Sequence, residues 1–196
     1  VFSTFMDATV GGIELMTGAY PARFGGRLSS VLDVRSVEER HPGVNATVDV
    51  SALGASAKIG GTVRGGRGMW SVAGRRTYAD AVTAAFTNEV FPYHFRDLHA
   101  RAAYALSGGL RVGITAYGGA DALDLDLAQF ENDTLSPQAR DGAWTFDWGN
   151  QVVGVSLARD VGGRLTWEQR VSTSAFSTLI DVGVGSDQQR GSIRDV

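Results

Sequence analysis

Apolar and polar residues alternate one for one in runs spread along the chain, and this alternation restricts the fold more than any other feature. From 44 to 52, valines and alanines hold the even positions, and the odd positions hold Asn45, Thr47, Asp49 and Ser51. Similar runs lie at 55–64, 70–73, 98–106, 110–117, 153–158 and 165–170. Successive side chains of a strand point to opposite faces. The runs therefore predict a mainly β, antiparallel sheet with one apolar face.

Two architectures show such an alternation. In a soluble β-sandwich the apolar face packs against a second sheet, whereas in a membrane β-barrel it faces lipid and the polar face lines a wet lumen. The polar positions carry full charges, such as Arg64, Arg101 and Glu168. The longest runs are about 9 to 11 residues long, which is typical of tilted membrane strands, since soluble strands average about 5 to 6. The pattern favours a barrel and leaves the sandwich open.

The connections between the runs alternate between short and long. The short ones are rich in glycine and lie at 64–68, 107–109 and 160–163, and the long ones are predicted at 77–95, 121–142 and roughly 177–188. Bacterial barrels have short turns on the periplasmic side and long loops outside. If the first strand of the barrel starts on the periplasmic side, the long connections face outside only when the chain reverses once more before 64–68. We therefore predict a further tight hairpin near Leu53-Gly54-Ala55.

Counting the runs and their connections predicts about seven strands, with an eighth that begins at Gln189. A short helix is predicted within Thr77 to Phe86, where alanines are frequent. An open sheet leaves backbone groups unpaired in hydrocarbon. We therefore interpret the chain as part of a larger barrel.

Aromatic residues are expected at the strand ends, either as interfacial girdles or as ordinary strand residues. One group is Trp70, Tyr78, Phe91, Tyr93 and Phe95, and the next is Trp144, Phe146 and Trp148.

Composition excludes several classes of function. A net charge of -3 and a pI near 5.6 argue against nucleic-acid binding, which needs a basic surface. The absence of cysteine removes disulfides and thiolate metal ligands. No window has the ~20 apolar residues of a transmembrane helix. Nucleophile-elbow and phosphate-loop motifs are also absent, so we do not expect an enzyme.

Acidic residues crowd the second long connection and suggest a metal site. They are Asp121, Asp124 and Asp126, followed by Glu131 and Asp133. Crowded carboxylates suit Ca²⁺, although the EF-hand spacing is missing and a solvated acidic loop is the alternative. The histidines are scattered, and His94 and His99 fall on different faces if one strand holds both.

The chain begins with two strand-like runs, Gly12 to Thr17 and Leu28 to Val34, on either side of a Gly/Pro corner. The segment IELMTGAYPARFGGRLSSVLDV resembles the closing segment of the plug domain in TonB-dependent outer-membrane receptors. WSVAGRRTYAD is similar to an early barrel strand of that family, and FRDLHARAAYAL with GLRVGITAYGGAD is similar to the next barrel hairpin. By this resemblance, residues 1–38 are the C-terminal part of a plug and residues 39–196 are the N-terminal strands of the barrel. Because a signal peptide, a TonB box and the first half of the plug are not seen, we expect the chain to be a piece of a longer receptor.

The resemblance implies a transport function in the outer membrane of a Gram-negative-type bacterium. Members of the family import scarce ligands such as siderophore-bound iron, cobalamin or glycans, with energy from the TonB complex. The expected partners are therefore that complex, a small-molecule or glycan substrate and outer-membrane lipid. Four arginines are candidate contacts between plug and barrel or with substrate, and ordinary lumen charges are the alternative: Arg23, Arg27, Arg75 and Arg76. The alternative functions are a porin-like barrel without a plug and a soluble carbohydrate-binding β-sandwich.

Overall fold

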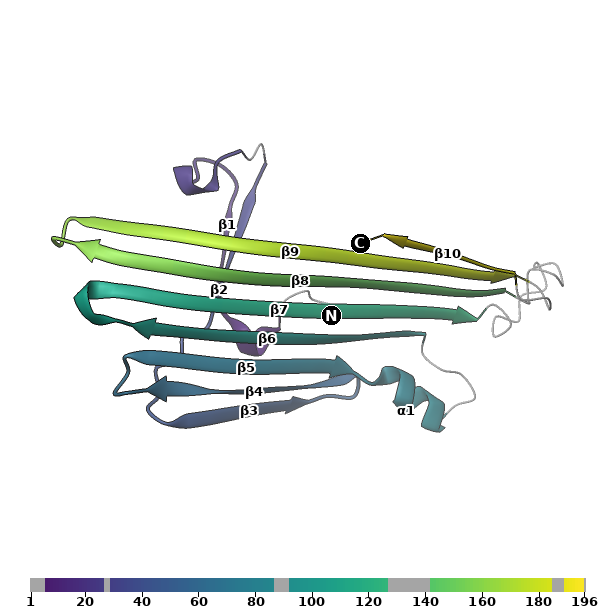
Figure 1. Ribbon diagram of the computed structural model, residues 1–196. Helices are drawn as coiled ribbons and strands as arrows, with labels where there is room; N and C mark the ends of the chain where they lie inside the picture. The colour runs from purple at the N-terminus through teal and green to yellow at the C-terminus, as the bar shows by residue number, and fades with distance from the viewer. Residues whose placement is uncertain (1–5, 27–28, 87–91, 127–141, 185–188, 196) are drawn as a thin grey trace.

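The chain forms one large antiparallel sheet and one small hairpin (Figure 1). This computed structural model describes residues 6–26, 29–86, 92–126, 142–184 and 189–195. The hairpin pairs β1 (Val10–Met16) with β2 (Val31–Ser36). The large sheet contains β3 (Val44–Val50), β4 (Gly54–Val63), β5 (Gly68–Thr77), β6 (Tyr93–Ala105), β7 (Leu110–Asp126), β8 (Gly142–Val161), β9 (Leu165–Val184) and β10 (Gln189–Asp195) in chain order. The predicted mainly β, antiparallel fold and the eighth strand at Gln189 are confirmed.

Every strand of the large sheet pairs with its neighbours in sequence, so the sheet is a series of hairpins. The predicted reversal near Leu53 is confirmed: β3 and β4 are joined at 51–53, where the Ser51 hydroxyl accepts the Gly54 N–H at 3.2 Å. The predicted helix is also confirmed as α1 (Ala79–Phe86), directly after β5. The three glycine-rich turns lie at one end of the sheet, and α1 lies at the other (Figure 1).

Paired glycines allow the three tight turns. Both glycines of each pair have positive φ, namely Gly65 and Gly66 (67° and 88°), Gly108 and Gly109 (71° and 74°), and Gly162 and Gly163 (61° and 69°). Residues with a Cβ rarely adopt this left-handed conformation, and hairpin turns whose twist matches the strands require it. The spacing of the glycine pairs therefore sets where the strands reverse at this end.

The two faces of the large sheet differ in what covers them. The buried side chains of β5 and β6 all point to one face: Ser71, Ala73, Thr77, Phe95, Asp97 and His99. Met6, Thr9 and Glu39 of the N-terminal segment are buried as well. The β1–β2 hairpin passes across the sheet in Figure 1, and residues 36–39 contact this face. We call it the covered face, and the opposite side the bare face.

The bare face carries an apolar belt. Its members are Val44, Val48, Val50, Ile59, Val63, Val72, Leu98, Ile114, Val153, Val155 and Val171, with exposed fractions from 40% to 73%. No second layer of the described residues packs on them. On β8 this face is apolar from Val153 to Val161 apart from Arg159, and with Val161 (48% exposed) the belt spans about 27 Å along the strand at ~3.4 Å per residue. The packed second sheet of a sandwich is therefore absent from the described part of the chain.

Strands β6 to β9 are longer than predicted, with 13, 17, 20 and 20 residues. The predictions that long connections start at Asp121 and at Ser177 are wrong, because β7 continues to Asp126 and β9 continues to Val184. The alternation does continue, but its phase inverts. In β7 the apolar residues hold even positions up to Ala116 and odd positions from Leu123, with no register shift between them.

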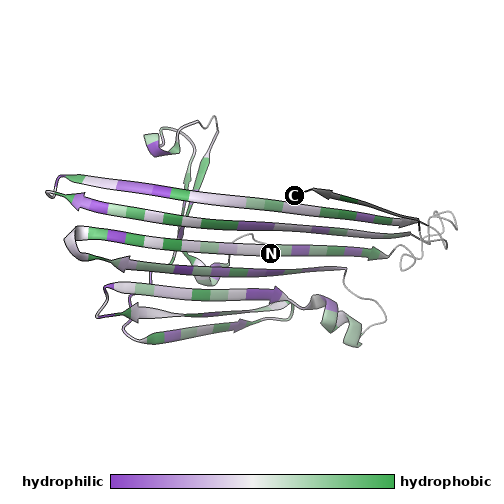
Figure 2. Ribbon diagram, in the orientation of Figure 1, coloured by the Kyte–Doolittle hydropathy of each residue, from purple (hydrophilic) through white to green (hydrophobic). Residues whose placement is uncertain are grey.

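We call the inverted part of these strands the far half, and the part that carries the belt the near half. The far half comprises 93–97 of β6, 119–126 of β7, 142–150 of β8 and 176–184 of β9. Figure 2 shows hydrophobic and hydrophilic residues interspersed along these strands. In the far half most of the large apolar side chains lie on the covered face, with Leu179 an exception, and most of the polar ones lie on the bare face.

Candidate functional site

A charged network lies on the covered face of β5, β6 and β7. Arg75 and Asp97 are direct partners across β5 and β6. The Arg75 Nε donates a hydrogen bond to Asp97 Oδ2 at 2.9 Å, and the Tyr117 hydroxyl donates to Asp97 Oδ1 at 3.0 Å. The Arg75 guanidinium also lies 4.6 Å from the centre of the Phe95 ring. Charge-assisted bonds of this kind are about twice as strong as neutral ones.

A glycine makes room for this network. Gly119 is the β7 partner of Asp97, and a methyl group at Gly119 would lie 2.6 Å from the Tyr117 hydroxyl oxygen and 2.9 Å from Asp97 Oδ1. The neighbouring Gly118 faces the other way, and nothing lies within 4 Å of the place its methyl would take. Gly119 is therefore needed for a packing reason that Gly118 does not share.

A second polar cluster attaches the N-terminal segment to the covered face. Glu39 accepts a hydrogen bond from Asn45 Nδ2 at 3.1 Å, and its other oxygen lies 2.6 Å from Lys58 Nζ. Burial by itself would raise the pKa of Glu39, but the hydrogen bonds from Lys58 and Asn45 hold this pKa below its usual range. We call Glu39, Asn45 and Lys58 the latch.

Arg101 holds the chain just before the latch. Its Nη1 donates to the carbonyl oxygens of Ser36 at 3.1 Å and Val37 at 3.4 Å. His99, next to Arg101 on the covered face, is 8% exposed, and its Nδ1 has no hydrogen-bond partner among the described residues. Hydrogen bonds and an ion pair thus join residues 36–39 to the sheet.

Aromatic rings continue the covered face into the far half. Tyr93 stacks on Trp148 with ring centres 6.0 Å apart and an angle of 25°, and Trp144 lies 6.0 Å from Phe146. Tyr93 is also 6.0 Å from Phe95, which joins this aromatic surface to the Arg75 network. The Tyr93 hydroxyl donates to Asp121. The prediction that Trp70 lies at the same strand ends as Tyr93 and Phe95 is wrong, because Trp70 lies near the glycine-rich turn at the start of β5.

The four predicted arginines do not form one site. Arg75 is in the charged network, whereas Arg76 points to the bare face and lies 3.8 Å from Asp80. Arg23 lies between β1 and β2, where it is 4.0 Å from Asp33 and stacks on Phe24. Arg27 falls outside the described residues. Among the three arginines of this set that the structure describes, Arg75 lies on the covered face of the large sheet.

The predicted calcium ligands are not brought together either. Asp121 lies on the covered face, and Asp124 lies on the bare face, where it accepts a hydrogen bond from Thr145 at 3.0 Å. The backbone of Asp126 pairs with Ala143, and Glu131 and Asp133 fall outside the described residues. In the described ranges no group of three His, Cys, Asp or Glu side chains gathers in a metal-binding arrangement. His94 and His99 do lie on opposite faces, as predicted.

Sequence reasoning missed the partners that make the site. Asp97, Tyr117, Lys58, Glu39 and Arg101 are charged or polar residues on predicted strands or on the linker, and the alternation marks some of them as polar-face positions. Their pairing depends on strand register, which periodicity does not supply. Had the register of β5 and β6 been known, Arg75 and Asp97 would have been recognised as opposite charges facing each other.

Comparisons of the chain with protein-family models, with curated proteins and with solved structures find no match. None of the helical segments that the structure describes has the length and hydropathy of a membrane-spanning helix.

Proposed function

We propose that this chain is part of a TonB-dependent outer-membrane receptor, in which β3 to β10 form a section of the barrel wall and residues up to about 38 end the plug. The observation that carries this proposal is the difference between the two faces. A polar face holds residues 36–39 through hydrogen bonds and an ion pair, while the opposite face is apolar and uncovered over the belt.

Lipid is the solvent that suits the belt. Apolar surface left in water costs about 25 cal/mol per Å² relative to burial, and soluble monomers rarely expose a continuous patch of this kind. The belt spans about 27 Å along β8, and a tilt of about 40° reduces this to roughly 21 Å of height, close to the ~25 Å apolar band of outer-membrane barrels. The covered face, with Arg75, Asp97, Lys58 and Arg101, then lines the lumen.

The connections support an orientation. The three glycine turns share one end, and short turns are periplasmic in bacterial barrels. The far half then lies toward the outside, so its aromatic surface faces the outer mouth of the lumen. A ligand entering from outside meets these rings first and the Arg75 network next. The ligand classes we propose are siderophore-bound iron, cobalamin and glycans.

The open edges of the sheet support a larger barrel. In the described residues β3 and β10 each pair on one side only. Unpaired backbone N–H and C=O groups cost several kcal/mol each in hydrocarbon. We therefore propose that further strands close the barrel.

The polar attachment of residues 36–39 suits a plug that has to move. Breaking the latch and the Arg101 contacts exposes groups that water can hydrate, whereas a packed apolar interface would resist separation. In this mechanism the TonB complex supplies the force, and no covalent chemistry takes place.

The proposal is tested on the complete gene product. We expect it to need detergent for extraction from the outer-membrane fraction and to migrate differently on gels before and after boiling. Ligand uptake should stop when the TonB complex is removed. Extraction in buffer alone would support the β-sandwich alternative. Passive solute flux independent of TonB would support the porin-like alternative.

A further inference from the structure

A row of aromatic rings lies on the covered face of the far half. Trp144, Phe146 and Trp148 hold alternate positions of β8 and therefore share this face. Phe176 of β9 continues the row, because it pairs with Asn150, two residues beyond Trp148. Trp144 is 40% exposed and Phe176 is 59% exposed, so large parts of both rings are open among the described residues. We call Trp144, Phe146, Trp148 and Phe176 the ring row.

The membrane does not account for the ring row. Interfacial aromatic girdles face outward to lipid, and the lumen side of a barrel wall is polar. In the proposed orientation the ring row faces the lumen, on the opposite side of the sheet from the belt. Large rings left in water are unfavourable, and exposed apolar patches mark binding sites. The ring row therefore indicates a ligand that covers it.

The ring row is elongated. The ring centres of Trp144 and Phe146 are 6.0 Å apart, and Tyr93 stacks on Trp148 at the same distance. From Trp144 to Asn150 the strand measures about 20 Å at ~3.4 Å per residue. A compact ligand can contact one or two of these rings, whereas a chain of linked units can contact all of them. The shape of the row therefore favours a linear ligand.

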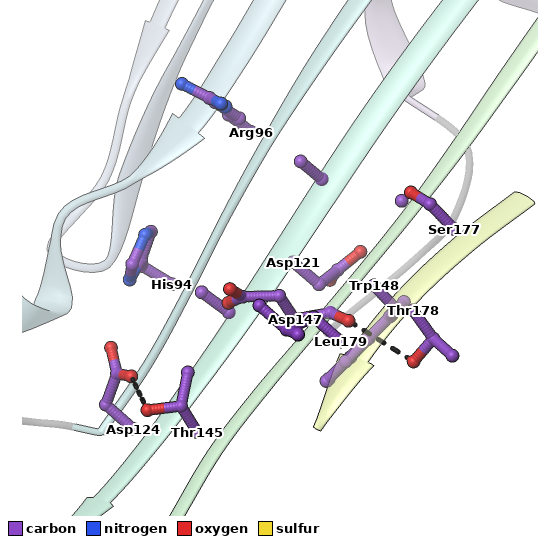
Figure 3. Close-up of a pocket in the computed structure, with 13 residues that line it drawn as sticks. His94, Arg96, Asp121, Asp124, Thr145, Asp147, Trp148, Ser177, Thr178 and Leu179 are labelled. Carbon is purple, nitrogen blue, oxygen red and sulfur yellow. Dashed lines mark hydrogen bonds between the residues drawn. The ribbon is translucent and has the colours of Figure 1, made fainter. Parts of the chain in front are cut away.

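Polar side chains lie beside the rings. Asn150 is exposed next to Phe176 and offers both a donor and an acceptor. Thr178, the β9 partner of Trp148, donates its hydroxyl to the carbonyl oxygen of Asp147 at 3.3 Å, and its oxygen can still accept a hydrogen bond (Figure 3). The faces of aromatic rings carry partial negative charge and attract C–H groups. Sugars combine such C–H faces with hydroxyl groups along their edges.

The charges on the covered face favour a neutral ligand. Arg96 of the far half points to the bare face, where it lines a hollow of about 670 Å³ with Asp124 and Asp147 (Figure 3). Asp121 lies on the covered face beside Trp148, so an anionic ligand would meet a like charge. Within the described part of β4 to β9, the cationic side chains of the covered face have acidic or carbonyl partners: Lys58 with Glu39, Arg75 with Asp97, Arg101 with Ser36 and Val37, Arg111 with Asp160, and Arg170 with Glu168.

We propose that the ring row binds a linear, neutral oligosaccharide. The inference rests on the proposed function, because that orientation places the row at the outer mouth of the lumen, and it narrows the proposed ligand classes to glycans. The C–H faces of successive sugars pack on the rings, and their hydroxyl groups bond with Asn150 and Thr178.

The test measures binding to the complete, detergent-purified protein by titration calorimetry. The probes are neutral hexasaccharides of glucose, mannose and xylose, the matching monosaccharides, a hexamer of glucuronic acid, and anionic ferric tris-catecholate. We expect a neutral hexasaccharide to bind at least tenfold more tightly than its monosaccharide, which covers a single ring, and than either anion. Trp144→Ala and Phe176→Ala should each weaken it about tenfold, near the upper end for one aromatic contact.

Matched controls separate the ring row from general effects of removing a ring. Trp167→Ala removes a tryptophan of similar exposure, 45%, from the bare face of β9 near the glycine-rich turn, and should leave binding unchanged. Asn150→Ala leaves the rings in place and should weaken the hexasaccharide about fivefold, the effect of one lost hydrogen bond.

Equal binding by the Trp144→Ala and Trp167→Ala proteins would overturn the inference. So would tighter binding of ferric tris-catecholate or of the glucuronic acid hexamer than of all three neutral hexasaccharides. Boiling-dependent gel mobility and TonB-dependent uptake report on the proposed function separately. If both persist while no neutral hexasaccharide binds, the inference fails and the proposed function stands, whereas loss of both in the unaltered protein rejects the proposed function itself.

Discussion

The near and far halves of β6 to β9 belong to the same strands, yet they present opposite surfaces. In the near half the bare face is apolar and the covered face is charged. In the far half aromatic rings lie on the covered face, and His94, Asp124 and Asp147 lie on the bare face. The register is continuous through the change. A strand can therefore keep its period of two while its surroundings, and with them the phase of its pattern, change along its length.

The comparison predicts that one added charge lowers the stability of the protein much more within the belt than beyond it. Ile114→Arg places a charge on the bare face of the near half, and we expect it to lower the free energy of unfolding by about 2 to 4 kcal/mol because the side chain meets hydrocarbon. Ser177→Arg, on the bare face of the far half, should cost less than about 1 kcal/mol. Urea unfolding in lipid vesicles measures both. Equal losses would mean that lipid does not distinguish the two halves.

The second prediction concerns the charged network, which lies where the two halves meet on the covered face. Asp97→Ala leaves the mostly buried Arg75 and the Tyr117 hydroxyl without this acceptor, and we expect a loss of about 1.5 to 3 kcal/mol. A double-mutant cycle with Arg75→Ala measures the coupling between the pair. Additive losses would show that the ion pair contributes nothing of its own.

The third prediction uses adjacent glycines at the same boundary. Gly119→Ala pushes a methyl group against the Tyr117 hydroxyl and Asp97, so we expect about 1 to 2 kcal/mol of destabilisation. Gly118→Ala points into open space on the bare face and should be neutral or slightly stabilising. Thermal unfolding of both variants provides the measurement. A larger effect at Gly118 would contradict the assignment of faces.

The smallest expected effect is at the latch, in the near half. Because its folded pKa is lowered, the stability that Glu39 contributes is complete above its unfolded pKa of about 4.3 and is lost as the pH falls through the lower folded pKa. Lys58 and His41 are the cationic groups that act on it. The protection of the amides of residues 36–39 against hydrogen exchange, measured relative to their intrinsic rates at each pH, should therefore fall below about pH 4.

Glu39→Gln should remove this pH dependence and cost about 1 kcal/mol at neutral pH, because the amide still accepts from Asn45. Glu38→Gln is the control, since Glu38 is exposed and pairs with Arg40 at 3.2 Å. The latch would be rejected if exchange at 36–39 responded to pH equally in the two variants.

Much of the fold could be predicted because its signals are local. The hairpin at 51–53, the three glycine turns and α1 each depend on a few neighbouring residues with defined backbone preferences. The end of β7 could not be predicted, because the acidic run from Asp121 is typical of a loop when it is read alone, and β9 likewise continues past Ser177 to Val184. Their strand character depends on pairing with β8, so it is a property of the sheet.

The sequence by itself determined that the chain folds into antiparallel hairpins with alternating faces, since alternation and glycine pairs act through the local geometry of the backbone. Tertiary structure decided which face the N-terminal segment covers and that Arg75 meets Asp97. These outcomes depend on register between strands, and a shift of one residue would move every side chain to the other face.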